Sequence, residues 1–187
     1  DLRIGANSGV ATARLLTFTT PDTTIITLTE NVRSRVTFGH DRALFGDLAL
    51  RLPDSGISTI HVAHPDAVLD LRGLFDATSV SGIGYAGIHA GSTILAEDRA
   101  ALRKTGPGTL DLRTTDPQGN RIKGLIVEGG TVIVATNPQM AWQQEEFQPD
   151  NVVVNGGILH MQGFGTNSGA NRGFQVGENG GTFYMTD

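Results

Sequence analysis

Short runs of alternating apolar and polar residues recur along the chain, separated by segments rich in Gly, Pro, Asn and Asp. Alternation with a period of two indicates a half-buried strand, because successive side chains of a strand point to opposite faces. The runs are rich in Val, Ile, Thr and Leu, which strands favour. A helical period is absent, although Glu97–Lys104 has the propensity for one or two helical turns before Gly106 and Pro107. The pattern predicts an all-β chain.

The runs also form a repeat. In the C-terminal half, each run follows a Gly-containing step and reads apolar-x-apolar, with first apolar residues Leu110, Val132, Leu159 and Phe183. The spacings between these residues are 22, 27 and 24 positions. Weaker copies lie at Leu48 and Leu69, with an earlier run at Thr24–Thr29. We expect a further run at Ser92–Leu95, inside the gap of 41 residues between Leu69 and Leu110.

Strands of this length cannot bury their apolar faces alone, whereas stacked coils bury a continuous core. The repeat therefore predicts a single-stranded parallel β-helix of about seven or eight coils, with 21 to 27 residues per coil. The Gly-Gly step before each strand fits a corner with positive φ. Residues 1–187 are expected to form one continuous solenoid, irregular over 1–104 and regular over 105–187. The side chains expected to point inward in columns are Leu110, Leu112, Val132, Val134, Leu159, Met161, Phe183 and Met185.

The repeat resembles the passenger-associated strand repeats of bacterial autotransporter-like surface proteins. A typical unit of that family runs Gly-x-Gly-Thr-Leu-x-Leu, then a Gly-rich turn, then Val-x-x-Gly-Thr-Leu. The same order is seen in Gly106–Leu112, Gly119 and Val127–Val132. The resemblance covers residues 105–187 and implies a right-handed β-helix that is secreted or displayed on the cell surface as a stalk or scaffold. It implies no catalytic residues.

Composition narrows the functional classes. The chain of 187 residues has a net charge of −5, contains 25 Gly and has no Cys. Proteins that bind the phosphate backbone are usually basic, so nucleic-acid binding is disfavoured. Without Cys there are no disulfides and no zinc–thiolate sites. No run approaches the roughly 20 apolar residues of a membrane helix, so membrane insertion is not expected either.

The residues between the two apolar positions of each run define an outward row. This row includes Asp70, Asp111, His160 and Tyr184. Arg72 and Arg113 lie two residues after Asp70 and Asp111. We expect two Asp/Arg pairs, separated from each other by the coil around Ser92–Leu95. One interpretation is an exposed ion-pair ladder worth about 0.2–1 kcal/mol per pair. The other is the acidic face of a Ca²⁺-dependent polysaccharide lyase with Arg as the base.

His160 and Tyr184 form a second candidate, either a small patch on which a sugar ring stacks or ordinary surface. His61 and His64 lie three positions apart on a predicted strand and so point to opposite faces, which is poor geometry for a metal ion. We therefore expect no catalytic residue, no metal site and no cofactor.

Three functions remain open. The first is a structural or adhesive scaffold outside the cell, on the bacterial surface. The second is a polysaccharide-active β-helix, either lyase or glycoside hydrolase, and the third is a trimeric phage or particle fibre segment. Because a β-helix exposes strand edges at its ends, we expect the chain to be a segment of a longer protein, or to stack on further coils or copies of itself. Surface glycans and other cell-surface proteins are the other expected partners.

Overall fold

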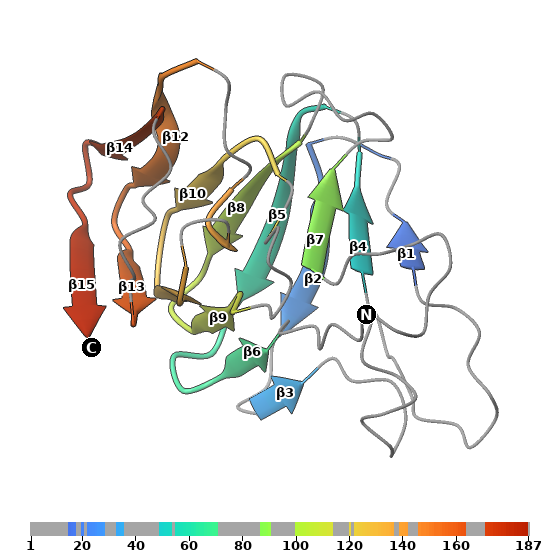
Figure 1. Cartoon of the computed structure of the whole chain (residues 1–187). Helices are drawn as coiled ribbons and strands as arrows, with labels where there is room; N and C mark the ends of the chain where they lie inside the picture. The colour runs from blue at the N-terminus through green and yellow to red at the C-terminus, as the bar shows by residue number, and fades with distance from the viewer. Residues whose placement is uncertain are drawn as a thin grey trace, which may run out of the picture.

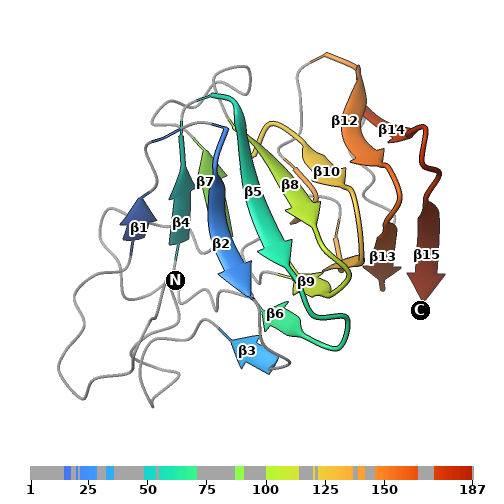
Figure 2. The ribbon, with the colours of Figure 1, turned by 180° about the vertical axis from the view of Figure 1, so that it is seen from behind.

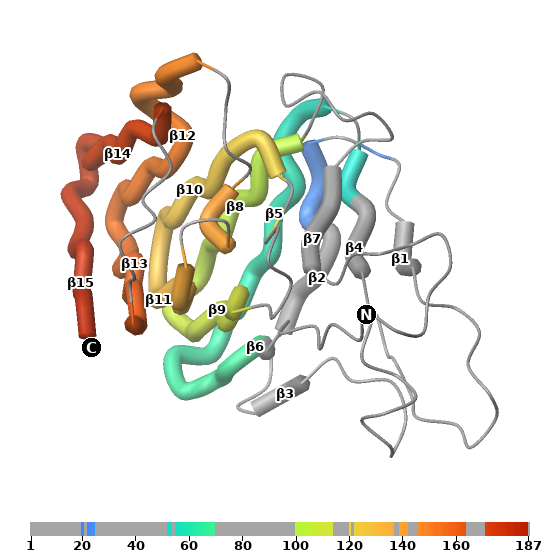
Figure 3. The backbone as a smooth tube through the Cα atoms, viewed as in Figure 1, coloured from blue at the N-terminus to red at the C-terminus, as the bar shows by residue number. Residues whose placement is uncertain are grey.

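In the computed structural model the described part of the chain is built from short parallel strands, and the described residues contain no α-helix. The described residues are 15–17, 20, 22–28, 33–35, 49–53, 55–70, 87–90, 100–113, 120, 122–136, 139–141, 146–163 and 171–186. Figure 3 follows the backbone through them. The all-β, parallel part of the prediction is confirmed.

The strands form three sheets. Sheet A runs in the order β1 (Leu15–Thr17), β4 (Ala49–Leu52), β7 (Gly87–Ala90). Sheet B runs in the order β14 (Arg172–Val176), β12 (Gln148–Val154), β10 (Leu125–Val127), β8 (Ala101–Thr105), β5 (Ile57–Val62), β2 (Thr24–Leu28). Sheet C runs in the order β15 (Thr182–Thr186), β13 (Ile158–Gln162), β11 (Thr131–Val134), β9 (Thr109–Asp111), β6 (Val68–Asp70), β3 (Arg33–Arg35).

Strands of sheets B and C alternate along the chain. Each strand of sheet B is followed along the chain by a strand of sheet C, and the two six-stranded sheets have matching orders. Figure 1 and, from behind, Figure 2 show these strand pairs side by side, with the pair β14 and β15 at one end of the row. Each strand pair therefore adds one layer to the same two sheets.

The register between strands aligns the apolar positions. Leu69, Leu110, Val132, Leu159 and Phe183 are consecutive Cα partners across sheet C, as the repeat predicts. Six of the eight residues predicted to point inward are buried, namely Leu110, Leu112, Val132, Val134, Leu159 and Met161. Phe183 packs against this core, whereas Met185 is 68% exposed because it lies in the last strand. The alternation and the spacing together predicted this column correctly.

The predicted coil spacing is wrong in the N-terminal half. Leu69 pairs directly with Leu110, so no layer of sheet C separates them, and Ser92–Leu95 lies outside the described residues. Leu50 pairs with Leu16 and Ile88 in sheet A instead of preceding Leu69 in sheet C. The described part of the chain accordingly has six layers of sheets B and C, not seven or eight. The longer spacing accommodates the strands of sheet A.

The segment that ends at Lys104 is also different from its prediction. Its residues from Ala101 to Lys104 belong to strand β8, Ala101–Thr105, along which burial alternates. Leu102 and Lys104 point inward and are fully buried. β8 lies between β5 and β10, so hydrogen bonding to two neighbours overrides a modest helical propensity.

Glycine forms the corner between sheets B and C. The corner residues Gly130, Gly156 and Gly180 have φ of 61°, 96° and 72°, as the Gly-Gly pattern predicted. At Gly130 the layers also approach closely, because a Cβ there would lie 2.2 Å from the carbonyl oxygen of Gly108 in the preceding layer. No side chain other than hydrogen fits at that distance.

Two buried side-chain amides, of Asn120 and Gln139, form hydrogen bonds within the loops that follow β9 and β11. Asn120 Nδ2 donates to the carbonyl oxygen of Gln139 at 2.6 Å and to that of Leu112 at 3.3 Å. The Gln139 side-chain oxygen in turn accepts from the backbone N–H groups of Ala135 and Thr136. These bonds join the segment after β9 to the segment after β11.

Among the described residues, no helix is long and apolar enough to cross a membrane.

We expect Gly130→Ala to destabilise the fold more than Gly180→Ala. Both positions have positive φ, which costs an L-residue about 1–2 kcal/mol. A Cβ at Gly180 meets no atom within 4 Å, whereas one at Gly130 collides with backbone of the preceding layer. Urea unfolding of the two variants should therefore give a further loss of about 1–3 kcal/mol for Gly130→Ala, as for other overpacked positions. Equal losses would contradict the close approach.

Candidate functional site

The outward row of sheet C carries the polar residues that the sequence singled out. Asp70, Asp111, Ile133, His160 and Tyr184 are consecutive Cα partners on β6, β9, β11, β13 and β15. The predicted row is therefore confirmed from Asp70 to Tyr184. Arg72 lies outside the described residues, and Asp70 is described through its backbone alone.

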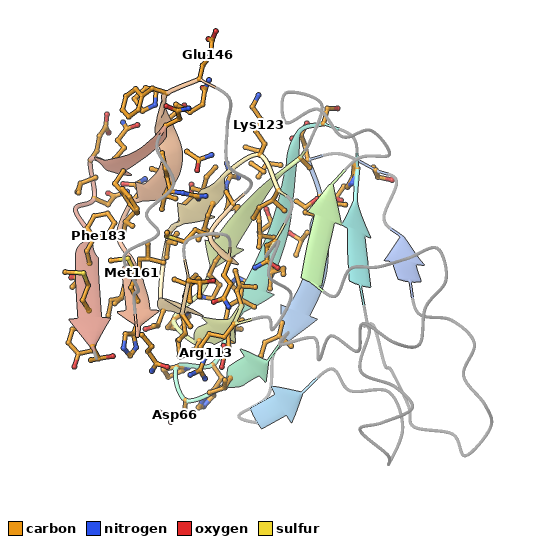
Figure 4. The ribbon with its side chains drawn as sticks, viewed as in Figure 1. Asp66, Arg113, Lys123, Glu146, Met161 and Phe183 are labelled. Atoms are coloured by element: carbon orange, nitrogen blue, oxygen red, sulfur yellow. The ribbon has the colours of Figure 1, made fainter. Side chains whose placement is uncertain are left out.

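Asp111 and Arg113 form a two-pronged ion pair. Arg113 Nε donates to Asp111 Oδ1 at 2.9 Å, and Nη2 donates to Oδ2 at 2.6 Å. The backbone N–H of Arg113 also donates to Oδ1 at 3.2 Å. Arg113 Nη1 donates to the side-chain oxygen of Gln162, two strands further along the sheet. The guanidinium of Arg113, labelled in Figure 4, thus joins β9 to β13, the second strand along the sheet.

The burial of this pair differs from the exposed ladder expected from sequence. Asp111 is 3% exposed, and its carboxylate is enclosed by the guanidinium and the backbone of Arg113. The expected coil between the two Asp positions is also absent, since β6 pairs directly with β9. A carboxylate this well enclosed is poorly placed to take a proton from a substrate. Removing Arg113 would leave the buried carboxylate of Asp111 without this counter-ion, so the pair is structurally important.

His160, Tyr184 and Thr186 lie together at the end of the outward row. The rings of His160 and Tyr184 are 4.7 Å apart between centroids and tilted by 46°. His160 Nε2 is 2.9 Å from Thr186 Oγ1, and Tyr184 is 52% exposed. The two rings and two hydroxyl groups form a small amphipathic surface. Stacking of a sugar ring on it remains a prediction.

The two histidines His61 and His64 have separate partners. His61 Nδ1 is 2.9 Å from Thr105 Oγ1, and His64 Nδ1 accepts from the backbone N–H of Asp66 at 3.2 Å. Across the described ranges, no group of three or more His, Cys, Asp or Glu residues is arranged to hold a metal ion.

Lys104 is the buried charged residue that the sequence reasoning missed. It occupies an inward position of β8, between Ile60 and Val127 in the neighbouring strands. Its Nζ donates to the carbonyl oxygens of Thr105, Gly106 and Gly129 at 2.9, 2.7 and 2.9 Å. Burial lowers the pKa of Lys104 from 10.5 to about 8, so at neutral pH the ammonium still has three protons to donate.

The alternation of β8 contained the signal for this lysine. Lys104 is two residues after the inward Leu102 and two before the corner residue Gly106, which is in phase with the apolar column. Its ammonium joins the corner of its own layer to Gly129 in the next layer. Lys104 therefore connects successive layers from inside the core.

A second cation, Arg172, lies at the start of β14. Its Nη2 donates to the carbonyl oxygen of Ala141 at 2.6 Å, which joins β14 to the segment before β12. Burial lowers the pKa of Arg172 to about 10, so its guanidinium is charged at neutral pH. Its role in the described part of the chain is to hold a connecting segment.

Comparison with known proteins identified no relative. No family model, no curated protein and no solved structure matches the chain.

We expect the stability of the protein to rise between pH 8 and pH 10.5 because of Lys104. In this range the unfolded chain retains a proton that the folded chain has released, so unfolding takes up a proton and a higher pH opposes it. The contribution is complete above pH 10.5 and is lost as the pH falls through about 8, and its size is at most about 3 kcal/mol.

Urea unfolding at pH 7.5 and pH 10 measures this effect. Lys104→Met should remove the rise, because it removes the titrating group. Lys123, the other lysine of the chain, is exposed, so Lys123→Met should keep the wild-type rise. The same pH dependence in wild type and Lys104→Met would contradict the assignment.

Proposed function

We propose that this chain is a right-handed, single-stranded parallel β-helix that serves as a non-catalytic structural or adhesive scaffold outside the cell, on the bacterial surface. The alternation between sheets B and C, with sheet A completing the longer N-terminal coils, supports the β-helix. Right-handedness agrees with the general preference of parallel crossover connections.

The observation that carries the functional proposal is that these charged side chains bind other groups of the same chain. Asp111 and Arg113 pair with each other, and Lys104 binds three carbonyl groups of the corners. Arg103 Nε in β8 and Glu128 Oε1, in the residue directly after β10, lie 3.4 Å apart. These charges hold layers together, which is what a scaffold requires and an active site does not.

The enclosed Asp111 also distinguishes this proposal from a polysaccharide-active enzyme. A hydrolase needs carboxylates that reach the substrate, with one of them free to exchange a proton. The Ca²⁺-dependent lyase considered above needs a carboxylate free to bind Ca²⁺ and an Arg free to act as the base. Asp111 has Asp70 as its neighbour in register, but its carboxylate is buried against Arg113. Surface glycans then remain candidates as ligands that are bound without being cleaved.

The resemblance to autotransporter-like passenger repeats supports the location. In such a setting the partners are further coils or copies of the chain at the solenoid ends, other cell-surface proteins, and surface glycans. The end formed by β14 and β15 favours the first of these, because its apolar residues Phe174, Val176 and Met185 are exposed by 46%, 53% and 68%.

Labelling of cells tests the proposed location. Antibodies against the folded chain should stain intact cells of the organism that carries the gene as strongly as permeabilised cells, and external protease should remove the staining. A cytoplasmic protein labelled in parallel provides the control. Staining that appears only after permeabilisation would overturn the surface assignment.

A cleavage assay tests the non-catalytic part. The chain should release no reducing ends and no unsaturated products from acidic or neutral polysaccharides, with or without Ca²⁺. Cleavage by the wild-type chain that is lost in a folded Asp111→Asn variant would instead establish the enzyme.

A further inference from the structure

The ammonium group of Lys104 is surrounded by backbone acceptors in the middle of the stack. The carbonyl oxygens of Thr105, Gly106 and Gly129 lie 2.9, 2.7 and 2.9 Å from Nζ, and the side chain is fully buried. In the part of the chain that the structure describes, no carboxylate pairs with Nζ. A protonated primary amine has three N–H donors, so the number of acceptors equals the number of donors.

The corner that holds this ammonium differs in length from the corner of the next layer. Four residues separate Lys104 from Thr109, whereas three residues separate their register partners Val127 and Thr131. The side chain at the matching inward position of the next layer is the apolar Val127. The lysine therefore coincides with the longer of the two corners.

Two of the three carbonyl groups depend on the ammonium for a donor within the chain. Among the described residues, no backbone N–H donates to the carbonyl oxygen of Gly106 or Gly129, whereas that of Gly108 accepts from the N–H of Thr131 at 3.2 Å. A carbonyl group that faces a buried side chain needs a hydrogen-bond donor, because leaving it without one is costly. The fold thus presents acceptors that a positively charged donor has to fill.

The hydrocarbon stem of Lys104 lies in an apolar part of the core. Its register partners Ile60 and Val127 are fully buried, and so is Leu102, the inward residue before it on β8. Apolar surroundings for a short alkyl chain therefore lead to three acceptors for the charged group at its end. A primary alkylammonium ion has this combination of parts.

From these features we propose that the corner between β8 and β9 is a binding site for a primary alkylammonium group, which the chain fills with its own Lys104. A quaternary ammonium group has the same charge but no N–H to donate. Divalent cations such as Ca²⁺ are bound with the help of carboxylates, and this site contains neutral carbonyl groups. The site does not depend on the proposed location at the cell surface, so the two proposals stand or fall separately.

Rescue of a truncated side chain by a free amine tests the site. Lys104→Ala removes the atoms Cγ, Cδ, Cε and Nζ, which correspond to the heavy atoms of n-propylammonium. At pH 7, where a free alkylamine is protonated, n-propylammonium should stabilise the folded variant, because a ligand that binds only the folded state opposes unfolding. With a Kd of about 25 mM, an amine concentration of about 100 mM lowers the unfolding constant about fivefold. Urea unfolding at constant ionic strength, balanced with sodium chloride, measures this change.

Matched variants and ligands separate this site from general effects of the amine. The wild-type chain and Lys104→Met keep the space filled and should not respond to n-propylammonium. Leu102→Ala truncates another fully buried, inward side chain of β8 and should not respond either. For Lys104→Ala itself, n-propyltrimethylammonium lacks the N–H donors and propanol lacks the charge, so neither should replace n-propylammonium.

Several results would overturn the proposal. An equal response of the wild-type chain or of Leu102→Ala would show a non-specific effect, and equal stabilisation by n-propyltrimethylammonium would show that the three N–H donors do not matter. If Lys104→Ala is unfolded without ligand, n-propylammonium should restore its far-ultraviolet circular dichroism, and a chain that stays unfolded would count against the site. Stabilisation by KCl alone would show a metal-ion site instead of an ammonium site.

Discussion

The stack depends on the close approach of backbones at the corner between sheets B and C. Gly130 lies so near the carbonyl group of Gly108 that a Cβ at position 130 would be 2.2 Å from its oxygen. The same closeness of the layers allows Lys104 to donate a hydrogen bond to Gly129 of the next layer. Once the corner sets this spacing, the strands on either side have to pair in register. Columns such as Leu110, Val132 and Leu159 follow from that register rather than from independent side-chain preferences.

The sequence predicted the features that repeat. Apolar-x-apolar runs after glycine-containing steps identified the strands of sheet C and their register from Leu110 to Phe183, because each layer there turns through a glycine-containing corner. The same alignment correctly brought Asp111, His160 and Tyr184 into one outward row. A regular local pattern reports reliably on a regular backbone.

What the sequence did not predict depends on features without a period. Sheet A interrupts the even spacing that was extrapolated from the C-terminal half, and so Leu69 was separated from its true neighbour Leu110. Lys104 was overlooked because a lysine in an inward position is rare, and its three carbonyl partners come from two different layers. The burial of Asp111 depends on how the long Arg113 side chain folds back, which residue order alone does not specify.

The connections between strands divide into two classes with different freedom to evolve. Three to five residues separate each strand of sheet B from the strand of sheet C that follows it. The connections from sheet C back to sheet B are longer, with nine residues after β13, thirteen after β9 and after β11, twenty-one between β3 and β5, and thirty between β6 and β8. Lengthening a connection of the first class would disturb the glycine corner, but the second class tolerates insertion because chain entropy rises only slowly with loop length. Longer or altered loops can therefore be acquired in the second class of connection while the glycine corners and the register of the sheets stay unchanged, so a lineage of such chains can vary these loops without having to re-evolve how it folds.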